Sequence, residues 1–87
     1  MEDKLDSLLK QFFFMELEYC GSQGFNDGTR NAYYLGKTRD GEYEIDVRII
    51  EELNTVEIWE KMRSENEEKN LLGKARKAER GWRILAN

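Results

Sequence analysis

Residues 32–49 read AYYLGKTRDGEYEIDVRI, two runs of alternating apolar and polar residues on either side of Asp40-Gly41. An Asp-Gly pair in this setting predicts a β-hairpin with a two-residue type I′ turn, because that turn needs a positive φ at both central positions. The hairpin would pair residues 32–39 with residues 42–49, with Arg39 opposite Glu42 and Lys37 opposite Glu44. Its predicted core face carries Ala32, Tyr34, Gly36, Thr38, Tyr43, Ile45, Val47 and Ile49.

The other face of this hairpin is the predicted solvent face. It carries Tyr33, Leu35, Lys37, Arg39, Glu42, Glu44, Asp46 and Arg48. Tyr33 and Leu35 are its apolar members, and a small apolar spot inside a polar rim is typical of a binding hot spot. Isolated exposed apolar side chains are the competing interpretation. The candidate protein-contact residues are Phe25, Tyr33, Leu35, Asp46 and Arg48.

The N-terminal residues 2–13 predict a helix. Leu5, Leu8, Leu9 and Phe12 recur at the spacing of one helix face. The period then changes over residues 14–20, where apolar and polar residues alternate as in a strand. We expect a strand there, with a longer helix as the alternative.

Residues 21–31 predict a loop. Three glycines stand there with Asn, Asp and Ser, the residues that favour turns. Phe25 lies in the middle of this segment. Long loops often carry function, so Phe25 joins the candidate contacts as an apolar loop residue. The alternative is that it folds back on the core.

A second helix is predicted over residues 55–69. Asn54 followed by Glu57 fits a capping box, and Leu53 and Ile58 have the spacing of a hydrophobic staple. An apolar stripe continues this pattern through Val56, Trp59 and Met62.

The C-terminal segment favours a hairpin of residues 71–77 with residues 82–86, although a helix ending near Gly81 stays open. Leu72-Gly73-Lys74-Ala75-Arg76 echoes Leu35-Gly36-Lys37-Thr38-Arg39, and each precedes a turn and a strand-like run. A helix would contain Gly73, which costs about 1 kcal/mol in a helix interior.

Together these elements predict an α+β protein of one small domain, residues 1–87, in the order α-β-β-β-α-β-β. The antiparallel sheet is built around the hairpin 32–39/42–49, with helices 2–13 and 55–69 on one face. Only 39% of the residues are apolar and 37% are charged, so a small core lies under a charged surface.

Composition argues against several classes of function. The chain has no histidine, and its single cysteine, Cys20, rules out an internal disulfide and suits a reducing compartment. No Gly-rich phosphate loop and no calcium-binding loop is present, so we expect no cofactor and no metal. Because there is no histidine and Cys20 has no local partner base, we expect no catalytic residue. No apolar run approaches the ~20 residues of a membrane span. The expected protein is a soluble, cytoplasmic non-enzyme.

Charge is sorted along the chain. Residues 40–68 hold eleven acidic and three basic side chains, whereas residues 69–87 hold one acidic and six basic ones. Opposed charged regions steer partners, or copies of the same chain, through their field. The basic segment raises the alternative of a nucleic-acid accessory protein, whose candidate contacts are Lys74, Arg76, Lys77, Arg80, Trp82 and Arg83. The whole chain is acidic, with pI near 4.9, which argues against a dedicated nucleic-acid binder.

An acidic nucleic-acid mimic is a further alternative. Glu42, Glu44 and Asp46 share one strand face, at a spacing close to that of backbone phosphates. In the predicted register Lys37 lies opposite Glu44 and Arg39 lies opposite Glu42, so these two basic side chains would neutralise much of the acidic face.

The leading interpretation is a non-catalytic module that binds another protein. By analogy of size and fold alone, such proteins serve as adaptors, secretion-chaperone-like dimers or phage-encoded inhibitors. The partner, the organism, the oligomeric state and whether binding inhibits, delivers or assembles stay open.

Overall fold

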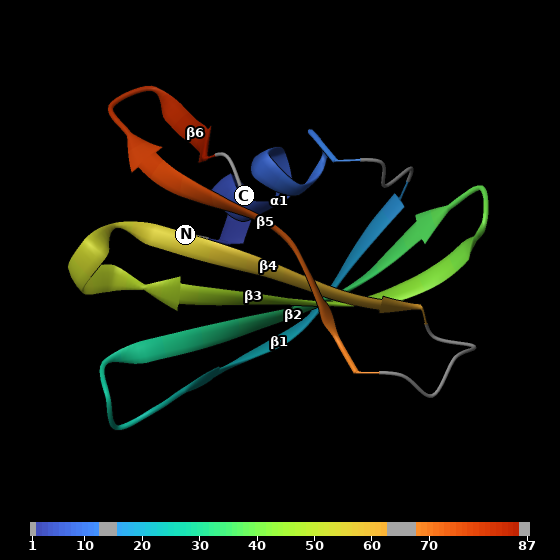
Figure 1. Cartoon of the computed structure of the whole chain (residues 1–87), viewed down its shortest axis with the longest axis horizontal. Coiled ribbons are helices and arrows are strands. Elements are labelled where there is room, and N and C mark those ends of the chain that lie inside the picture. The colour runs from blue at the N-terminus through green and yellow to red at the C-terminus, as the bar shows by residue number, and fades with distance from the viewer. Residues whose placement is uncertain (1, 13–15, 63–67, 86–87) are drawn as a thin grey trace.

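The computed structural model describes the backbone of residues 2–12, 16–62 and 68–85, and within these ranges the side chains from residue 5 onward (Figure 1). Within these ranges one short helix, α1, is followed by six strands and a single 3₁₀ turn, η1. The bounds are α1 Glu2–Leu9, β1 Glu16–Gly24, β2 Thr29–Thr38, β3 Gly41–Ile50, η1 Glu51–Leu53, β4 Thr55–Met62, β5 Asn70–Ala78 and β6 Gly81–Leu85. The strands form one antiparallel sheet in which each strand pairs with the next in sequence. The predicted α+β class with two helices is therefore wrong, because the protein is sheet-dominated.

Helix α1 packs against one face of the curled sheet, which we call the core face (Figure 1). Leu5, Leu8 and Leu9 are fully buried there, so the predicted apolar side of the helix is confirmed. The helix is shorter than the predicted 2–13, since residues 10–12 form a turn. The sheet contributes the other buried side chains, which are Ala32, Tyr34, Ile45, Val47, Ile49, Val56, Ile58 and Ala75.

The strand predicted over residues 14–20 is confirmed from residue 16 onward, while residues 14 and 15 lie outside the described residues. The loop predicted over 21–31 is wrong, because β1 continues to Gly24 and β2 begins at Thr29. Polar residues and glycines are tolerated in β1 since it is an exposed edge strand. Its pairing with β2 contains a bulge at Cys20.

The hairpin of β2 and β3 is confirmed with both predicted faces, but the predicted register is wrong by two residues. Thr38 pairs with Gly41 and Lys37 with Glu42, so Glu44 does not face Lys37 and Arg39 lies in the turn. Gly41 takes φ 145°, whereas Asp40 does not take the positive φ that a type I′ turn at 40–41 requires. An even shift keeps every side chain on its predicted face.

The helix predicted over residues 55–69 is wrong. Thr55–Met62 is strand β4, residues 63–67 lie outside the described residues, and residues 68–69 are not helical. Asn54 has φ 51° and ends η1 instead of capping a helix, and Leu53 is 59% exposed, so no staple forms. Val56 and Ile58 are both buried because they alternate onto the core face.

The C-terminal hairpin is confirmed and the helical alternative is wrong, since β5 pairs with β6. Its turn repeats the arrangement seen between β2 and β3. In each hairpin a two-residue turn is followed by a glycine with positive φ, Gly41 in one and Gly81 (98°) in the other. Gly73 is buried on the core face, where the ring of Phe12 covers it.

Candidate protein-binding face

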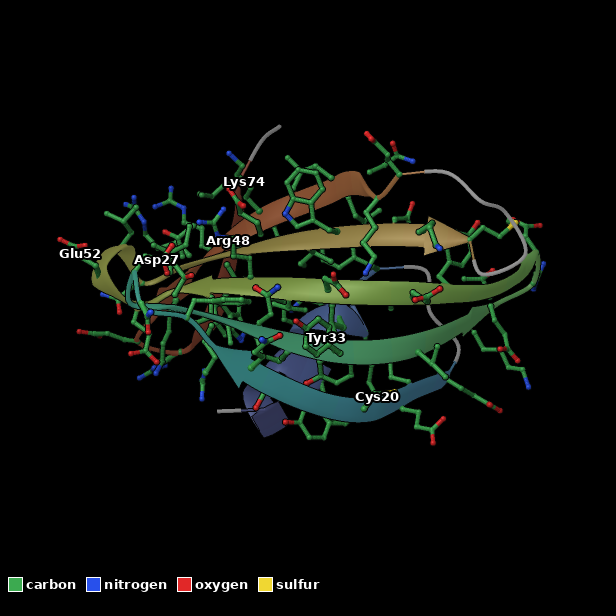
Figure 2. The ribbon with its side chains drawn as sticks, turned by 90° about the horizontal axis from the view of Figure 1, so that it is seen from below. Cys20, Asp27, Tyr33, Arg48, Glu52 and Lys74 are labelled. Atoms are coloured by element: carbon green, nitrogen blue, oxygen red, sulfur yellow. The ribbon has the colours of Figure 1, made fainter. Side chains whose placement is uncertain are left out.

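The face of the sheet opposite α1, which we call the outer face, brings together the candidate residues of the central hairpin. Figure 2 looks onto this face, with α1 behind the sheet and Tyr33 near the middle. Strand pairing sets one row across it: Tyr33 lies opposite Asp46, Asp46 opposite Trp59, and Trp59 opposite Leu71. Leu35 lies on the same face of β2, two residues from Tyr33.

Four apolar or aromatic side chains form what we call the apolar strip, Leu35, Tyr33, Trp59 and Leu71. Each is half-buried, although none belongs to the core. The strip is held by polar contacts at its aromatic members. The Tyr33 hydroxyl donates to Gln23 Oε1 (3.1 Å), and the Trp59 Nε1–H donates to Glu57 Oε1 (3.4 Å).

Asp46 and Arg48, two further predicted contacts, take part in ion pairs on this face. The Asp46 carboxylate pairs with Lys69, and Arg48 lies 3.9 Å from Asp27, as the neighbouring labels in Figure 2 illustrate. Two more ion pairs join neighbouring strands. They are Glu44–Lys61 at 3.4 Å and Glu57–Lys74 at 3.8 Å. Charged side chains that pair with one another thus flank the apolar strip, and the Asp46–Lys69 pair lies within its row, between Tyr33 and Trp59.

Phe25, the fifth predicted contact, is 43% exposed on the turn between β1 and β2 and lies apart from the strip. Asp27 orders this turn. Its Oδ1 accepts hydrogen bonds from the Thr29 hydroxyl (2.6 Å) and the Thr29 N–H (3.0 Å). These bonds, the hydroxyl first, and the nearby Arg48 charge lower the pKa of Asp27 below its ordinary value.

Trp59 was not predicted as a site residue because the predicted helix 55–69 contained it, and Leu71 was predicted only as the first residue of the C-terminal hairpin. The alternation of Val56 and Ile58 with Glu57 and Trp59 was a usable signal for a strand. With β4 in place, its pairing with β3 brings Trp59 onto the outer face beside Asp46.

The residues of the nucleic-acid alternative are split between the two faces. Lys74, Arg76 and Arg83 project from the outer face by their register. Trp82 is half-buried against the core with Lys77 as its cross-strand neighbour, and Arg80 lies in the β5–β6 turn. Trp82 therefore does not lie beside the basic side chains of the outer face, where it could stack on a nucleobase of a bound strand.

The acidic strand face proposed for mimicry is largely neutralised. Glu42, Glu44 and Asp46 do share the outer face, but Glu44 and Asp46 pair with lysines as described above, and Lys37 is the cross-strand neighbour of Glu42. The predicted partners, Lys37 for Glu44 and Arg39 for Glu42, are wrong. The structure gives Lys61 for Glu44 and Lys37 for Glu42.

Within the described ranges, no group of three or more acidic or cysteine side chains could hold a metal ion, and Cys20 is an exposed free thiol. No helix in this part of the chain is long and apolar enough to cross a membrane. No protein-family model, curated protein or solved structure matches the chain.

Proposed function

We propose that the protein is a non-catalytic binding module of the cytoplasm that contacts another protein chain through the outer face of its sheet. The observation that carries this proposal is the apolar strip, four half-exposed side chains from β2, β4 and β5 in the middle of a charged face. The free thiol of Cys20 is compatible with a reducing compartment.

The strip is not needed to complete the core. Helix α1 and the alternate side chains of the strands already form a closed set of buried apolar residues on the core face. Tyrosine and tryptophan on the opposite face are the residue types that contribute most to protein interfaces, because each offers a large rigid area with a polar group at its edge. Protein binding accounts for their placement.

The ion pairs around the strip favour a protein partner over a small molecule. Glu44–Lys61 and Glu57–Lys74 join neighbouring strands and restrict the long side chains at the edge of the strip. A polar rim of this kind excludes water from a central contact and reduces the entropy lost on binding. A broad sheet face is also flatter than the enclosed pockets that small ligands prefer.

The test compares Leu35→Glu with Leu53→Glu. Both substitutions place a carboxylate at a leucine outside the core, but Leu53 lies on η1 and not on the strip. The tagged chains are used to capture proteins from an extract of the native cells, with chemical cross-linking and mass spectrometry as the readout. We expect Leu35→Glu to lose the partner captured by the wild type and Leu53→Glu to keep it, with unfolding curves confirming that both chains fold.

Capture that is the same for both variants and the wild type would contradict the proposal. Titration of fluorescent duplex and single-stranded oligonucleotides at low and moderate salt tests the alternative directly. Salt-dependent binding at tens of micromolar chain would favour a nucleic-acid partner instead.

A further inference from the structure

The outer face carries two groups of like charges that lie at opposite corners. Glu16 and Glu18 project from β1, and Arg76 and Arg83 project from β5 and β6. None of the four makes an ion pair within the described residues, although Lys37 is the cross-strand neighbour of Glu16 at the acidic end. We call these groups the acidic corner and the basic corner.

The basic corner is costly in an isolated chain. Arg76 and Arg83 are directly opposite each other in the β5–β6 ladder, and both are exposed. Like charges in this relation destabilise a sheet, whereas an anionic group placed between them removes the repulsion. The corner is therefore suited to carboxylates supplied by another chain.

The strand register locates the apolar strip between the two corners. Glu18 is in the same row as Leu35, at the β1 edge. Arg76 lies two positions beyond Lys74, near the β6 edge and toward the opposite ends of the strands. A line from the acidic corner to the basic corner therefore crosses the row of the strip near its middle, where the Asp46–Lys69 pair lies between Tyr33 and Trp59.

We propose that the partner of the outer face is a second copy of this chain. This inference rests on the proposed function and names the occupant of the same face. A two-fold axis lying in the contact plane and passing through the strip brings strip onto strip. It also brings the acidic corner of each copy onto the basic corner of the other. Such a contact is isologous, so it closes as a dimer and does not propagate.

The outer face is comparable in extent to one side of a standard specific interface. The molecule measures 34 × 29 × 24 Å along its principal axes, and the face seen in Figure 2 spans the longest and the shortest of them. Its projected area is of the same order as the ~800 Å² that each partner buries in a standard specific interface.

The experiment measures the mass of the full chain by sedimentation velocity from micromolar to several hundred micromolar concentration. We expect a concentration-dependent dimer that weakens as salt is raised. The acidic-corner variant Glu16→Lys/Glu18→Lys and the basic-corner variant Arg76→Glu/Arg83→Glu should each dimerise about tenfold or more weakly than the wild type, because each places like charges in contact.

Mixing the two variants gives the decisive result. One variant then carries bases at both corners and the other carries acids at both, so the mixture should form a heterodimer at least as readily as the wild type forms its dimer. The control Glu52→Lys/Glu79→Lys changes the net charge by the same amount as the acidic-corner variant, at exposed positions in η1 and the β5–β6 turn. It should leave the dimer intact.

A chain that stays monomeric at all concentrations overturns the inference. A dimer whose dissociation constant is the same in the wild type and in both corner variants overturns it as well. A chain that is monomeric but loses a cellular partner on Leu35→Glu would overturn only this inference and leave the proposed function standing. A chain whose self-association and cellular capture are both unaffected by Leu35→Glu would remove the proposed function as well.

Discussion

The two faces of this sheet are built from adjacent residues but have different compositions and contacts. The core face is closed by α1 and holds buried aliphatic side chains with Tyr34. The outer face holds half-exposed side chains and ion pairs between neighbouring strands. Ile58 and Trp59 show how sharply the change occurs, since one is fully buried and the next lies on the open side.

The contrast predicts that stability and the proposed protein binding depend on different residues. In a strand successive side chains point to opposite faces, so one strand can contribute a buried residue to the core and an exposed one to the proposed contact. Substitutions on the core face should change the free energy of unfolding, and those on the outer face should change association.

The largest effect is expected at Ile58, which is fully buried between Val47 and Gly73 in the ladder. Ile58→Ala should lower the free energy of unfolding by about 2–5 kcal/mol, because it removes buried methyl groups and leaves a cavity. Leu35→Ala, on the outer face, should cost about 1 kcal/mol or less. Urea unfolding followed by circular dichroism measures both.

If Ile58→Ala and Leu35→Ala lower the free energy of unfolding by the same amount, the outer face around Leu35 is part of the core. If Ile58→Ala does not fold, Ile58→Val takes its place, with an expected loss of about 0.5–1.5 kcal/mol.

The face assignments of β2 and β3 could be predicted from the sequence because alternation is local information. Tyr34 and Ile45 were expected inside and Tyr33 and Leu35 outside, and they are. The register could not be obtained in the same way. It depends on which turn residues accept a positive φ, and Gly41 does so alone in its turn.

Strand β4 could not be separated from a helix by spacing alone. Val56, Trp59 and Met62 fit a helical stripe, while Val56 and Ile58 fit alternation. Pairing with β3 decides between them, because it buries Ile58 beside Val47. That pairing is a tertiary interaction, so the local pattern allowed a strand at Trp59 without deciding for it, and the row that joins Trp59 to Leu71 followed only from the pairing of β4.

The next effect in size is expected at Gly73 on the core face. A Cβ at this position would lie 3.3 Å from Cε1 of Phe12, and a valine would need the ring to move. Gly73→Val should therefore cost about 1–3 kcal/mol. The matched control is Gly24→Val on the edge strand β1, where a Cβ would meet nothing within 4 Å.

Urea midpoints for the two glycine variants test this difference. A loss for Gly73→Val no larger than that for Gly24→Val would mean that the ring of Phe12 does not close the core over β5.

A smaller effect of opposite sign is expected at Glu60, which is directly opposite the buried Ile45 and therefore belongs to the core face. Burial raises the pKa of its carboxyl above the ordinary value of 4.5. The folded chain then holds this proton more tightly than the unfolded chain, so stability falls as pH rises through the window above 4.5. Glu60→Gln should stabilise the protein at neutral pH and flatten this pH dependence.

Glu57→Gln is the matched control for Glu60→Gln, because Glu57 lies three residues earlier on the same strand and on the outer face. It breaks the ion pair with Lys74, so it should leave stability unchanged or lower it by up to about 1 kcal/mol. Unfolding curves at several pH values compare the two. If Glu60→Gln lowers the free energy of unfolding at neutral pH, the ionised carboxylate of Glu60 stabilises the fold, and its burial on the core face is not destabilising.

The smallest effect is expected at the β1–β2 turn, where the side chain of Asp27 is exposed and its carboxylate accepts two hydrogen bonds from Thr29. Because the pKa of Asp27 is lowered, its contribution to stability is complete above the ordinary value of 3.8 and is lost as pH falls through the lowered value. Thr29→Val removes the hydroxyl and keeps the backbone donor, so the pKa of Asp27 should rise part of the way toward 3.8. An NMR titration of the Asp27 carboxyl carbon measures this directly. An unchanged titration midpoint would mean that the backbone N–H of Thr29 and the charge of Arg48 lower the pKa of Asp27. The turn would then be ordered by its backbone hydrogen bonds and not by the threonine hydroxyl.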